Sequence, residues 1–428
     1  MKQADPSRRW KTIYPWIAIT VSALFLVYKY ILQVSPSVMT NELMQAFHVH
    51  ATGLGNLSAT FFYSYLITQF FVGILLDKYS ARYLSAIAIL VAAFGAYFFS
   101  SADQLWSAEA CRLMMGVGAA FATVSYMKVA AMWFRPKQFA FVGGLLATAA
   151  MLGAIFGEAP LSLIVDSAGW RESMHMSAIL GFVIAGLFII VIRDRHTTHA
   201  FDQRHPPKAI RFKDVLSVMK KPQNWVLTFY SGLAFSPVAV FGGLWGNPFL
   251  EEMHHLTRTQ SAYMISLIFW GLLFGGPILG LVSGFIGRRK PVMLWCAVIG
   301  FFCLTSVIYL PSLPIWVDCI LLFIFGFCTG AFMLGFAVGR EINPIAMAAT
   351  VIALVNTGDA IFGGFTEPLV GKLLDMQWHG VMRHGVPYFD VTAYHNAFLL
   401  LPIYLAIAAG LVFFVKETYC ESLSEKSH

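Results

Sequence analysis

The sequence predicts an all-α membrane protein with twelve transmembrane helices, arranged as two six-helix parallel repeats. Of its 428 residues, 58% are hydrophobic and only 12% are charged, and the mean hydropathy is +0.69. Soluble domains are nearer half apolar and a quarter charged. Many stretches exceed the roughly 18 apolar residues that cross a bilayer. In addition, short motifs in the first half of the chain recur in the second half at a nearly constant offset.

Twelve apolar stretches are predicted to be membrane-spanning helices, because at this length only a helix satisfies its own backbone hydrogen bonds in lipid. The predicted spans are residues 14–34, 54–76, 83–101, 105–133, 138–165, 173–192, 224–250, 261–285, 291–311, 314–338, 345–367 and 394–415. The first stretch is too long for a cleaved signal peptide and others follow it, so we interpret it as a span.

The distribution of Lys and Arg predicts the orientation of the spans. With the N-terminus in the cytoplasm, 22 of the 29 Lys and Arg residues fall in inner segments and four in outer segments. The three that remain inside spans are Lys29, Arg112 and Lys128. This bias predicts a multi-pass protein of a bacterial inner membrane with both termini in the cytoplasm. It also accounts for the net charge of +7 without a nucleic-acid partner.

The basic segment Arg193–Gln223 is the longest predicted cytoplasmic connection, and it divides the chain into two halves. We therefore expect an N-terminal six-helix bundle at residues 1–195, a linker at 196–222 and a C-terminal six-helix bundle at 223–428. Residues 210–219 fit either a short amphipathic helix on the inner leaflet or an unstructured linker.

The two halves share motifs at matching places. The sequence "GILLDKYSAR" (Gly73–Arg82) closes span two, and "GLVSGFIGRR" (Gly280–Arg289) closes span eight, 207 residues later. A pair of acids eight residues apart also recurs, 209 residues later. These acids are Glu158 and Asp166 in the first half, and Glu367 and Asp375 in the second. Such repeats are typical of halves related by an axis along the membrane normal.

These motifs resemble those of the major facilitator superfamily, and the resemblance covers the whole chain. The family's loop after span two reads G-x-L-x-D-[RK]-x-G-[RK]-[RK]. Gly73 would allow close helix contact, and Asp77 would lock one conformation by pairing with a cation or a helix N-terminus of a neighbouring span. The residues that the resemblance assigns to gating are Gly73, Asp77, Lys78, Arg82, Gly280, Arg288 and Arg289. Gly284 stands where the second copy would carry its acid, so the second lock should be weaker.

Four further segments carry the resemblance. The sequence "RLMMGVG" in span four resembles the family's R-x-x-x-G-x-G. This resemblance implies a role for Arg112 in proton transfer. The alternative role for Arg112 is an ion pair with Glu109. The glycine spacing of span five resembles an antiporter motif, but Glu158 replaces the expected proline, which weakens an inference of drug efflux. Segments at Gly242–Leu250 and Gly339–Asn356 resemble a bacterial branch of nutrient and organic-acid permeases that includes the phagosomal nutrient transporters.

Carboxyl groups inside a membrane are rare and often belong to proton relays. Glu158 and Asp359 are the deepest acids in the sequence, and we expect one or both to carry a proton. Asn356 lies three residues before Asp359 and shares its helix face. The alternative for each acid is a buried ion pair or hydrogen bond between helices. Glu367, near the end of its span, is interpreted as an interfacial residue.

Lys29 is a charged residue about 8 Å from the predicted outer end of span one. It either reaches the periplasmic surface or binds the anionic group of a substrate, because the resemblance implies that span one lines a central cavity. In the second case it would hold Glu158 when the site is empty. The residues predicted to bind substrate are Lys29, Tyr28, Gln33, Tyr63, Gln69, Trp245, Asn356 and Asp359. Tyr30 and Tyr65 are further aromatic candidates, and helix packing is the alternative for all of these aromatic residues.

The sequence does not favour a metal site or an enzyme. The acids and histidines of Glu251–His255 are metal-ligand types, but we interpret the segment as a solvated outer loop. The six cysteines form no C-x-x-C motif, and no P-loop, Gly-x-Ser-x-Gly or His-Glu-x-x-His sequence is present. We therefore expect no enzyme activity, no metal and no cofactor.

The expected function is proton-coupled import of a small polar metabolite, such as an amino acid, an organic acid or a similar nutrient. Alternating access about a midplane site would drive it. The expected partners are the substrate, protons and the lipid bilayer, and the chain is expected to be a monomer. One alternative is a proton antiporter that exports a drug, a siderophore or a metabolite. A second alternative is a membrane sensor that transports nothing.

Overall fold

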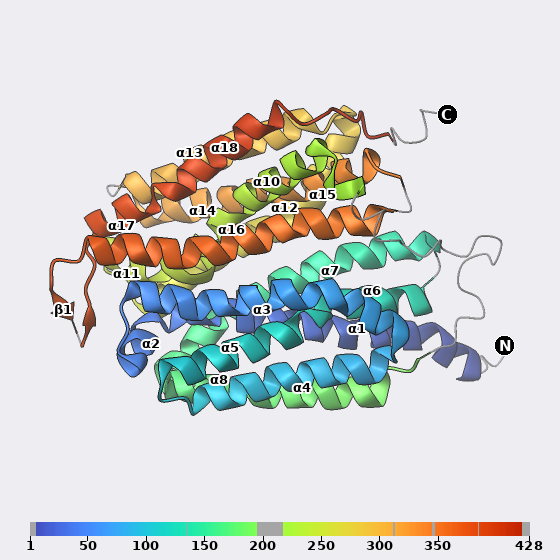
Figure 1. Cartoon of the computed structure of the whole chain (residues 1–428), viewed down its shortest axis with the longest axis horizontal. Helices are drawn as coiled ribbons and strands as arrows, with labels where there is room; N and C mark the ends of the chain where they lie inside the picture. Colours follow the sequence, from blue (N-terminus) through green and yellow to red (C-terminus); the bar gives the residue numbers. More distant parts are fainter. Residues whose placement is uncertain are drawn as a thin grey trace. The chain divides into compact units, whose positions relative to one another are not determined.

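The computed structural model describes residues 6–134, 136–194, 217–310, 313–344, 347–383 and 385–421, and they are almost entirely helical. In chain order the elements are α1 (Pro6–Val34), η1 (Ser35–Val38), α2 (Thr40–Phe47), α3 (Ala51–Lys78), α4 (Ala81–Ser100), α5 (Leu105–Ala119), α6 (Phe121–Trp133), α7 (Pro136–Phe156), α8 (Ala159–Val191), α10 (Pro222–Pro237), η2 (Val238–Trp245), α11 (Gly246–His254), α12 (Arg258–Ile286), α13 (Lys290–Tyr309), α14 (Ile315–Thr329), η3 (Gly330–Phe332), α15 (Met333–Glu341), α16 (Ala348–Met376), α17 (Val391–Phe398) and α18 (Leu400–Val412). Strands β1 (Met382–Arg383) and β2 (Val386–Pro387) form a short antiparallel hairpin after α16 (Figure 1).

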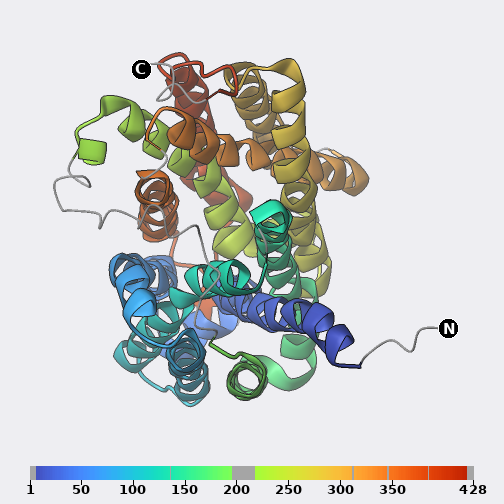
Figure 2. The same ribbon diagram turned by 90° about the vertical axis from the view of Figure 1, so that its right-hand side faces the viewer.

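The predicted spans correspond to helices of the structure. Within the described residues, ten segments are long and apolar enough to cross a membrane. One of them, Phe141–Val191, has 51 residues and contains predicted spans five and six, which Gly169 separates at a φ of +83°. The remaining predicted span coincides with the 29-residue helix α16. Within each unit of the chain the long helices run roughly alongside one another (Figure 1), and Figure 2 views them from one end, several of them obliquely.

The chain divides into two compact units. The first consists of the described residues of Met1–Ser35 and Tyr63–Asp202, and the second of those of Pro36–Phe62 and Gln203–His428. Helix α3 therefore belongs to both units. The predicted linker lies mostly outside the described residues, as does most of the amphipathic helix expected at 210–219. The predicted domain boundaries stay predictions.

Small residues bring the helix backbones together in both units. In the first unit, a Cβ at Gly118 of α5 would lie 2.3 Å from the carbonyl oxygen of Ala88 on α4. In the second unit, a Cβ at Gly326 of α14 would lie 1.9 Å from the carbonyl oxygen of Ile268 on α12. Close approach at small residues is the usual way in which helices associate in lipid, where no hydrophobic force drives them together.

Five predicted spans are interrupted rather than continuous, and two of them, spans four and twelve, simply divide into two helices at Ala120 and Leu399. Span five breaks between α7 and α8, where Glu158 has a φ of −103° and a ψ of −100°. Pro160 explains this break, because a proline within a helix lacks a hydrogen-bond donor and its ring clashes with the preceding turn. Span seven contains the π-helix η2, and span ten contains the 3-10 turn η3. Such irregular turns within helices are frequent at functional sites.

Candidate functional site

Lys29 of α1 is buried in the first unit beside two tyrosine rings. Its side chain is 6% exposed, so it does not reach the surface as the first alternative required. Its Nζ lies 3.5 Å from the ring centroid of Tyr30 and 5.0 Å from that of Tyr65 on α3. Among the described residues, Lys29 forms no ion pair, and so it does not hold Glu158. A desolvated cation over aromatic rings gains about 2 kcal/mol, which offsets only part of the cost of burying an unpaired charge.

The other binding residues predicted in the first unit differ in their burial. Tyr28 is fully buried, and its hydroxyl packs against Gly181 of α8, so its ring lies between helices. Gln33, Tyr63 and Gln69 are half-buried. The rings that Lys29 contacts thus belong to Tyr30 and Tyr65 and not to Tyr28 or Tyr63. Sequence periodicity placed Tyr65 on the correct helix but did not show which aromatic residue faces the lysine.

Arg112 contacts the last turn of α1, and Glu158 follows a glycine that packs against the same turn. The buried Arg112 guanidinium donates from Nη1 to the carbonyl oxygen of Leu32 at 2.7 Å. Gly157 packs against Ile31 and Val34, and the following residue, Glu158, is completely buried at the break between α7 and α8. Arg112 and the residue that precedes Glu158 therefore contact the same turn of span one inside the first unit.

Lys128, the third intramembrane cation, has a structural role. Its Nζ donates to the carbonyl oxygen of Leu76, in the last turn of α3. Cations near the C-terminus of a helix satisfy carbonyl groups that have no partner within the helix and interact favourably with the helix dipole.

Asp359 of α16 is buried in the second unit at the crossing with α10. Its side chain is 7% exposed, and its Oδ1 accepts a hydrogen bond of 2.9 Å from the Ser231 hydroxyl. The two helices touch through glycines, because a Cβ at Gly232 would lie 2.6 Å from the carbonyl oxygen of Gly358. Among the described residues, Ser231 is the one hydrogen-bond partner of Asp359, which leaves most of the carboxylate's acceptor capacity unused. Asn356, one turn earlier, is half-buried.

The irregular part of span seven is tied to α16. The indole of Trp245, at the end of η2, donates to the carbonyl oxygen of Glu367 at 3.0 Å. Glu367 is 1% exposed, so it is buried within unit two and not exposed as an interfacial residue would be. Asn247, which follows the π-helix, is also buried. The predicted residues Trp245 and Asp359 thus both lie at the contact between span seven and α16.

The residues assigned to gating differ in their surroundings. The Arg82 guanidinium donates from Nε to the carbonyl oxygen of Ile189 at 2.6 Å. Arg289 forms an ion pair of 2.7 Å with Glu341. Lys78 and Arg288 are exposed. A Cβ at Gly73 or Gly280 would meet no atom of the described residues within 4 Å, so the close helix contact expected at Gly73 is not found. Asp77 lies on α3, but its side chain is outside what the structure describes.

An acid after the last span of each half caps another helix of that half. The Asp194 carboxylate accepts from the backbone N–H of Arg82 at 3.4 Å and contacts the Ser80 hydroxyl, at the start of α4. The Glu417 carboxylate accepts from the backbone N–H groups of Arg289 at 2.9 Å and Lys290 at 3.1 Å, at the start of α13. The sequence motifs contain Arg82 and Arg289 but not these two acids, which are far from them in the chain.

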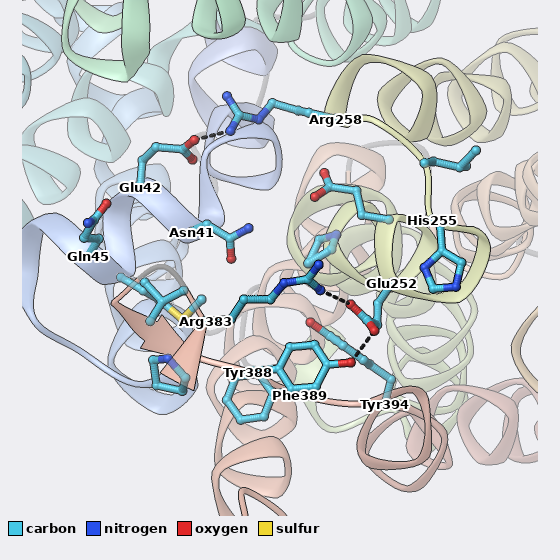
Figure 3. A pocket seen from close by; sticks show the side chains of 16 residues that line it. Asn41, Glu42, Gln45, Glu252, His255, Arg258, Arg383, Tyr388, Phe389 and Tyr394 are labelled. Carbon is cyan, nitrogen blue, oxygen red and sulfur yellow. Dashed lines mark hydrogen bonds and ion pairs between the residues drawn. The ribbon is translucent and has the colours of Figure 1, made fainter. Parts of the chain in front are cut away.

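A pocket of about 530 Å³ lies in the second unit, among α2, α11, the hairpin and the start of α17 (Figure 3). Glu42 forms an ion pair with Arg258. Glu252 pairs with Arg383 at 3.4 Å and accepts a hydrogen bond from the Tyr388 hydroxyl. This bond and burial raise the pKa of Tyr388.

The "EEMHH" segment contributes to this pocket from a helix and not from the solvated loop that we expected. Glu251 to His254 belong to α11, and Glu251, Glu252 and His255 line the pocket. Within the described residues, no group of three or more His, Cys, Asp or Glu side chains could hold a metal ion.

Comparisons with known proteins agree with this architecture. A sequence model described as Major Facilitator Superfamily matches residues 17–248. The uncharacterised transporter YybO of Bacillus subtilis is 23% identical over 391 residues, which cover 84% of this chain and 88% of that protein. A probable hexose phosphate transport protein of Chlamydia pneumoniae is 24% identical over 363 residues, which cover 76% and 78%.

Solved structures extend the likeness over the second half of the chain. A bacterial homologue of the human lysosomal transporter Spinster, in an inward-facing and unoccupied conformation, matches with a TM-score of 0.77. The identity is 15%, and the match covers 94% of this chain and 97% of that chain. At this identity the likeness shows a common all-helical fold.

Proposed function

Because this chain belongs to the Major Facilitator Superfamily, and is thus a secondary transporter and not an enzyme, we propose that it imports a small polar metabolite together with protons. The metabolite carries an anionic group, as an amino acid or an organic acid does. The chain works as a monomer in a bacterial inner membrane, with both termini in the cytoplasm, by alternating access.

Among the described residues, the buried Lys29 has no carboxylate partner, and this observation carries the proposal. An unpaired cation in a low-dielectric site attracts an anion far more strongly than it would in water. The rings of Tyr30 and Tyr65 hold the ammonium group but leave its charge uncompensated. An arriving carboxylate or phosphate supplies that compensation. The chlamydial relative is named as a probable hexose phosphate transport protein, and a hexose phosphate is also an anionic solute.

Asp359 and Glu158 are the proposed proton carriers. Both are buried, and Asp359 has a single hydrogen-bond donor, Ser231, among the described residues. Protonation removes the charge of a buried carboxylate and lets it donate a hydrogen bond. Glu158 lies at a helix break, and broken helices border the ion sites of many transporters.

Transport by the purified full chain in proteoliposomes tests the proposal. Radiolabelled amino acids, organic acids and sugar phosphates are offered under an imposed pH gradient, with and without a protonophore. We expect one of these anions to accumulate above its external concentration only when protons flow in the same direction. Accumulation driven by the opposite gradient would instead favour the antiporter. Uptake that the protonophore does not alter would contradict proton coupling, and specific binding without any uptake would favour the sensor.

A further inference from the structure

We propose that Asp375 is a positioning residue that latches the first half of α3 to α16, and that this latch opens and closes in each transport cycle. Asp375 has this role only if the chain is the transporter proposed above, since a protein with one fixed conformation has no need to release it. All the contacts that form the latch lie within the second unit of the chain.

The Asp375 carboxylate caps the N-terminus of α3. It accepts hydrogen bonds from the backbone N–H of Ala51 at 3.0 Å, from that of Thr52 at 2.8 Å and from the Thr52 hydroxyl at 2.5 Å. The first N–H groups of a helix have no acceptor within the helix, and the helix dipole favours a negative charge there. Bonds to a charged acceptor are roughly twice as strong as neutral ones. This single side chain therefore holds the end of α3.

The surfaces that meet beside the cap are made of small residues. A Cβ at Gly371 of α16 would lie 2.3 Å from the carbonyl oxygen of Ala51, and one at Gly55 of α3 would lie 2.6 Å from the Cα of Pro368. The two backbones thus touch without large side chains between them. Such a contact can separate without the repacking of interlocked side chains, so its stability depends strongly on the cap.

A second charged contact holds the segment just before α3. Glu42, in the first turn of α2, pairs with Arg258 at the start of α12, and both side chains border the pocket (Figure 3). Both are about three-quarters buried, at 27% and 22% exposed. Two charged contacts therefore fix the chain between α1 and the middle of α3.

The continuity of α3 makes release necessary. Ala51–Phe62 belongs to the second unit, whereas the rest of the helix belongs to the first. The stretch Asn56–Val72 contains neither glycine nor proline, the residues at which helices usually bend. If the two units move relative to each other, an unbent α3 cannot keep its contacts with both, and we infer that the end held by Asp375 is the one that separates.

Labelling of a buried reporter cysteine tests the latch without a substrate. Ser58 is fully buried one turn after Gly55, on the same face of α3, and Ser58→Cys replaces a single atom. The full chain with this reporter, in proteoliposomes, is treated with a charged methanethiosulfonate. We expect Asp375→Asn to speed labelling about fivefold, the factor that loss of one charged helix cap gives an equilibrium. Glu42→Gln should act in the same direction, and it keeps the test available if Asp375→Asn does not fold.

The matched control is Asp390→Asn. Asp390 caps α17 through the N–H of Ala393 at 2.8 Å and is a helix-capping acid of the same unit without a bond to α3. We expect it to leave the labelling rate of Ser58→Cys unchanged. The native Cys296, buried in α13, reports general destabilisation and should keep its slow rate in Asp375→Asn. The proposal is overturned if Asp375→Asn labels no faster than Asp390→Asn, or if Cys296 accelerates equally.

A reversible cross-link separates this proposal from the proposed function. The rings of His50 and Trp378 lie 4.8 Å apart beside the cap, so His50→Cys with Trp378→Cys can be joined by a short bis-thiosulfonate. We expect the cross-link to stop transport and a reductant to restore it, with the same double variant before cross-linking as the reference. Undiminished transport while cross-linked would refute the latch and leave the function intact. If the reduced protein transports nothing, the proposed transport function is refuted. The labelling experiment then still tests the latch independently.

Discussion

Replacing Lys29 with methionine separates the two roles that a buried lysine can have. Methionine keeps a long unbranched side chain between the rings of Tyr30 and Tyr65, so the core retains its packing. The change removes about 2 kcal/mol of cation–π attraction but also removes the cost of an unpaired buried charge. The two contributions oppose each other, and we expect the melting temperature to stay near that of the unmodified protein.

Substrate affinity should fall sharply in the same variant. A hydrogen bond to a charged group is worth about 1.5–3 kcal/mol, and the 6% exposure of Lys29 leaves little water to screen it. The dissociation constant should therefore rise about 10- to 150-fold. Lys29→Arg should restore affinity only in part, because a planar guanidinium differs in shape from an ammonium group.

Isothermal titration of the detergent-purified chain with the substrate found by the uptake assay measures this effect. Lys128→Met is the matched control, because Lys128 is an intramembrane cation of the same unit whose Nζ binds the carbonyl oxygen of Leu76. We expect it to lower stability and leave affinity unchanged. If Lys29→Met binds substrate as tightly as the unmodified chain, Lys29 is a packing residue and the assignment of an anionic substrate loses its basis.

Three further predictions concern coupling, gating and packing. Asp359→Asn or Glu158→Gln should abolish uphill accumulation and preserve counterflow exchange; if both variants still concentrate substrate, the proton is carried elsewhere. Asp77→Asn should cut the initial uptake rate strongly while the protein still elutes as a folded species in gel filtration, and a normal rate would remove Asp77 from the gate. Gly326→Ala should lower the free energy of unfolding by about 1–3 kcal/mol, because its Cβ would lie 1.9 Å from a backbone oxygen. Gly410→Ala has open space around it and should raise the free energy of unfolding by about 0.5–1 kcal/mol. Equal melting temperatures for the two variants would contradict this packing argument.

Hydropathy and charge sufficed to predict the helices, because long apolar runs have no other stable form in lipid. The break at Glu158 could also be predicted from the sequence, since Pro160 follows two residues later. The π-helix Val238–Trp245 could not be predicted in this way, because it depends on contacts such as that of Trp245 with α16. Local sequence patterns cannot show contacts of this kind.

The sites were predicted less completely than the helices for the same reason. Lys29 and Asp359 were conspicuous as charges within apolar runs. The ring of Tyr65 and the hydroxyl of Ser231, which contact them, are ordinary residues of such helices. The sequence indicated Asp375 only as the repeat of Asp166. Its hydrogen-bond partner Thr52 lies 323 residues away in the chain.

The unbroken length of α3 sets a threshold for motion. Its 28 residues extend about 42 Å. A tilt of about 10° around the midpoint would displace the first turn by about 3.6 Å, which exceeds the tolerance of a hydrogen bond. All three bonds to Asp375 would then fail together and not one after another. A small rotation of so long a helix therefore releases its first turn in a single two-state transition. We expect intermediates with a half-released α3 to be sparsely populated.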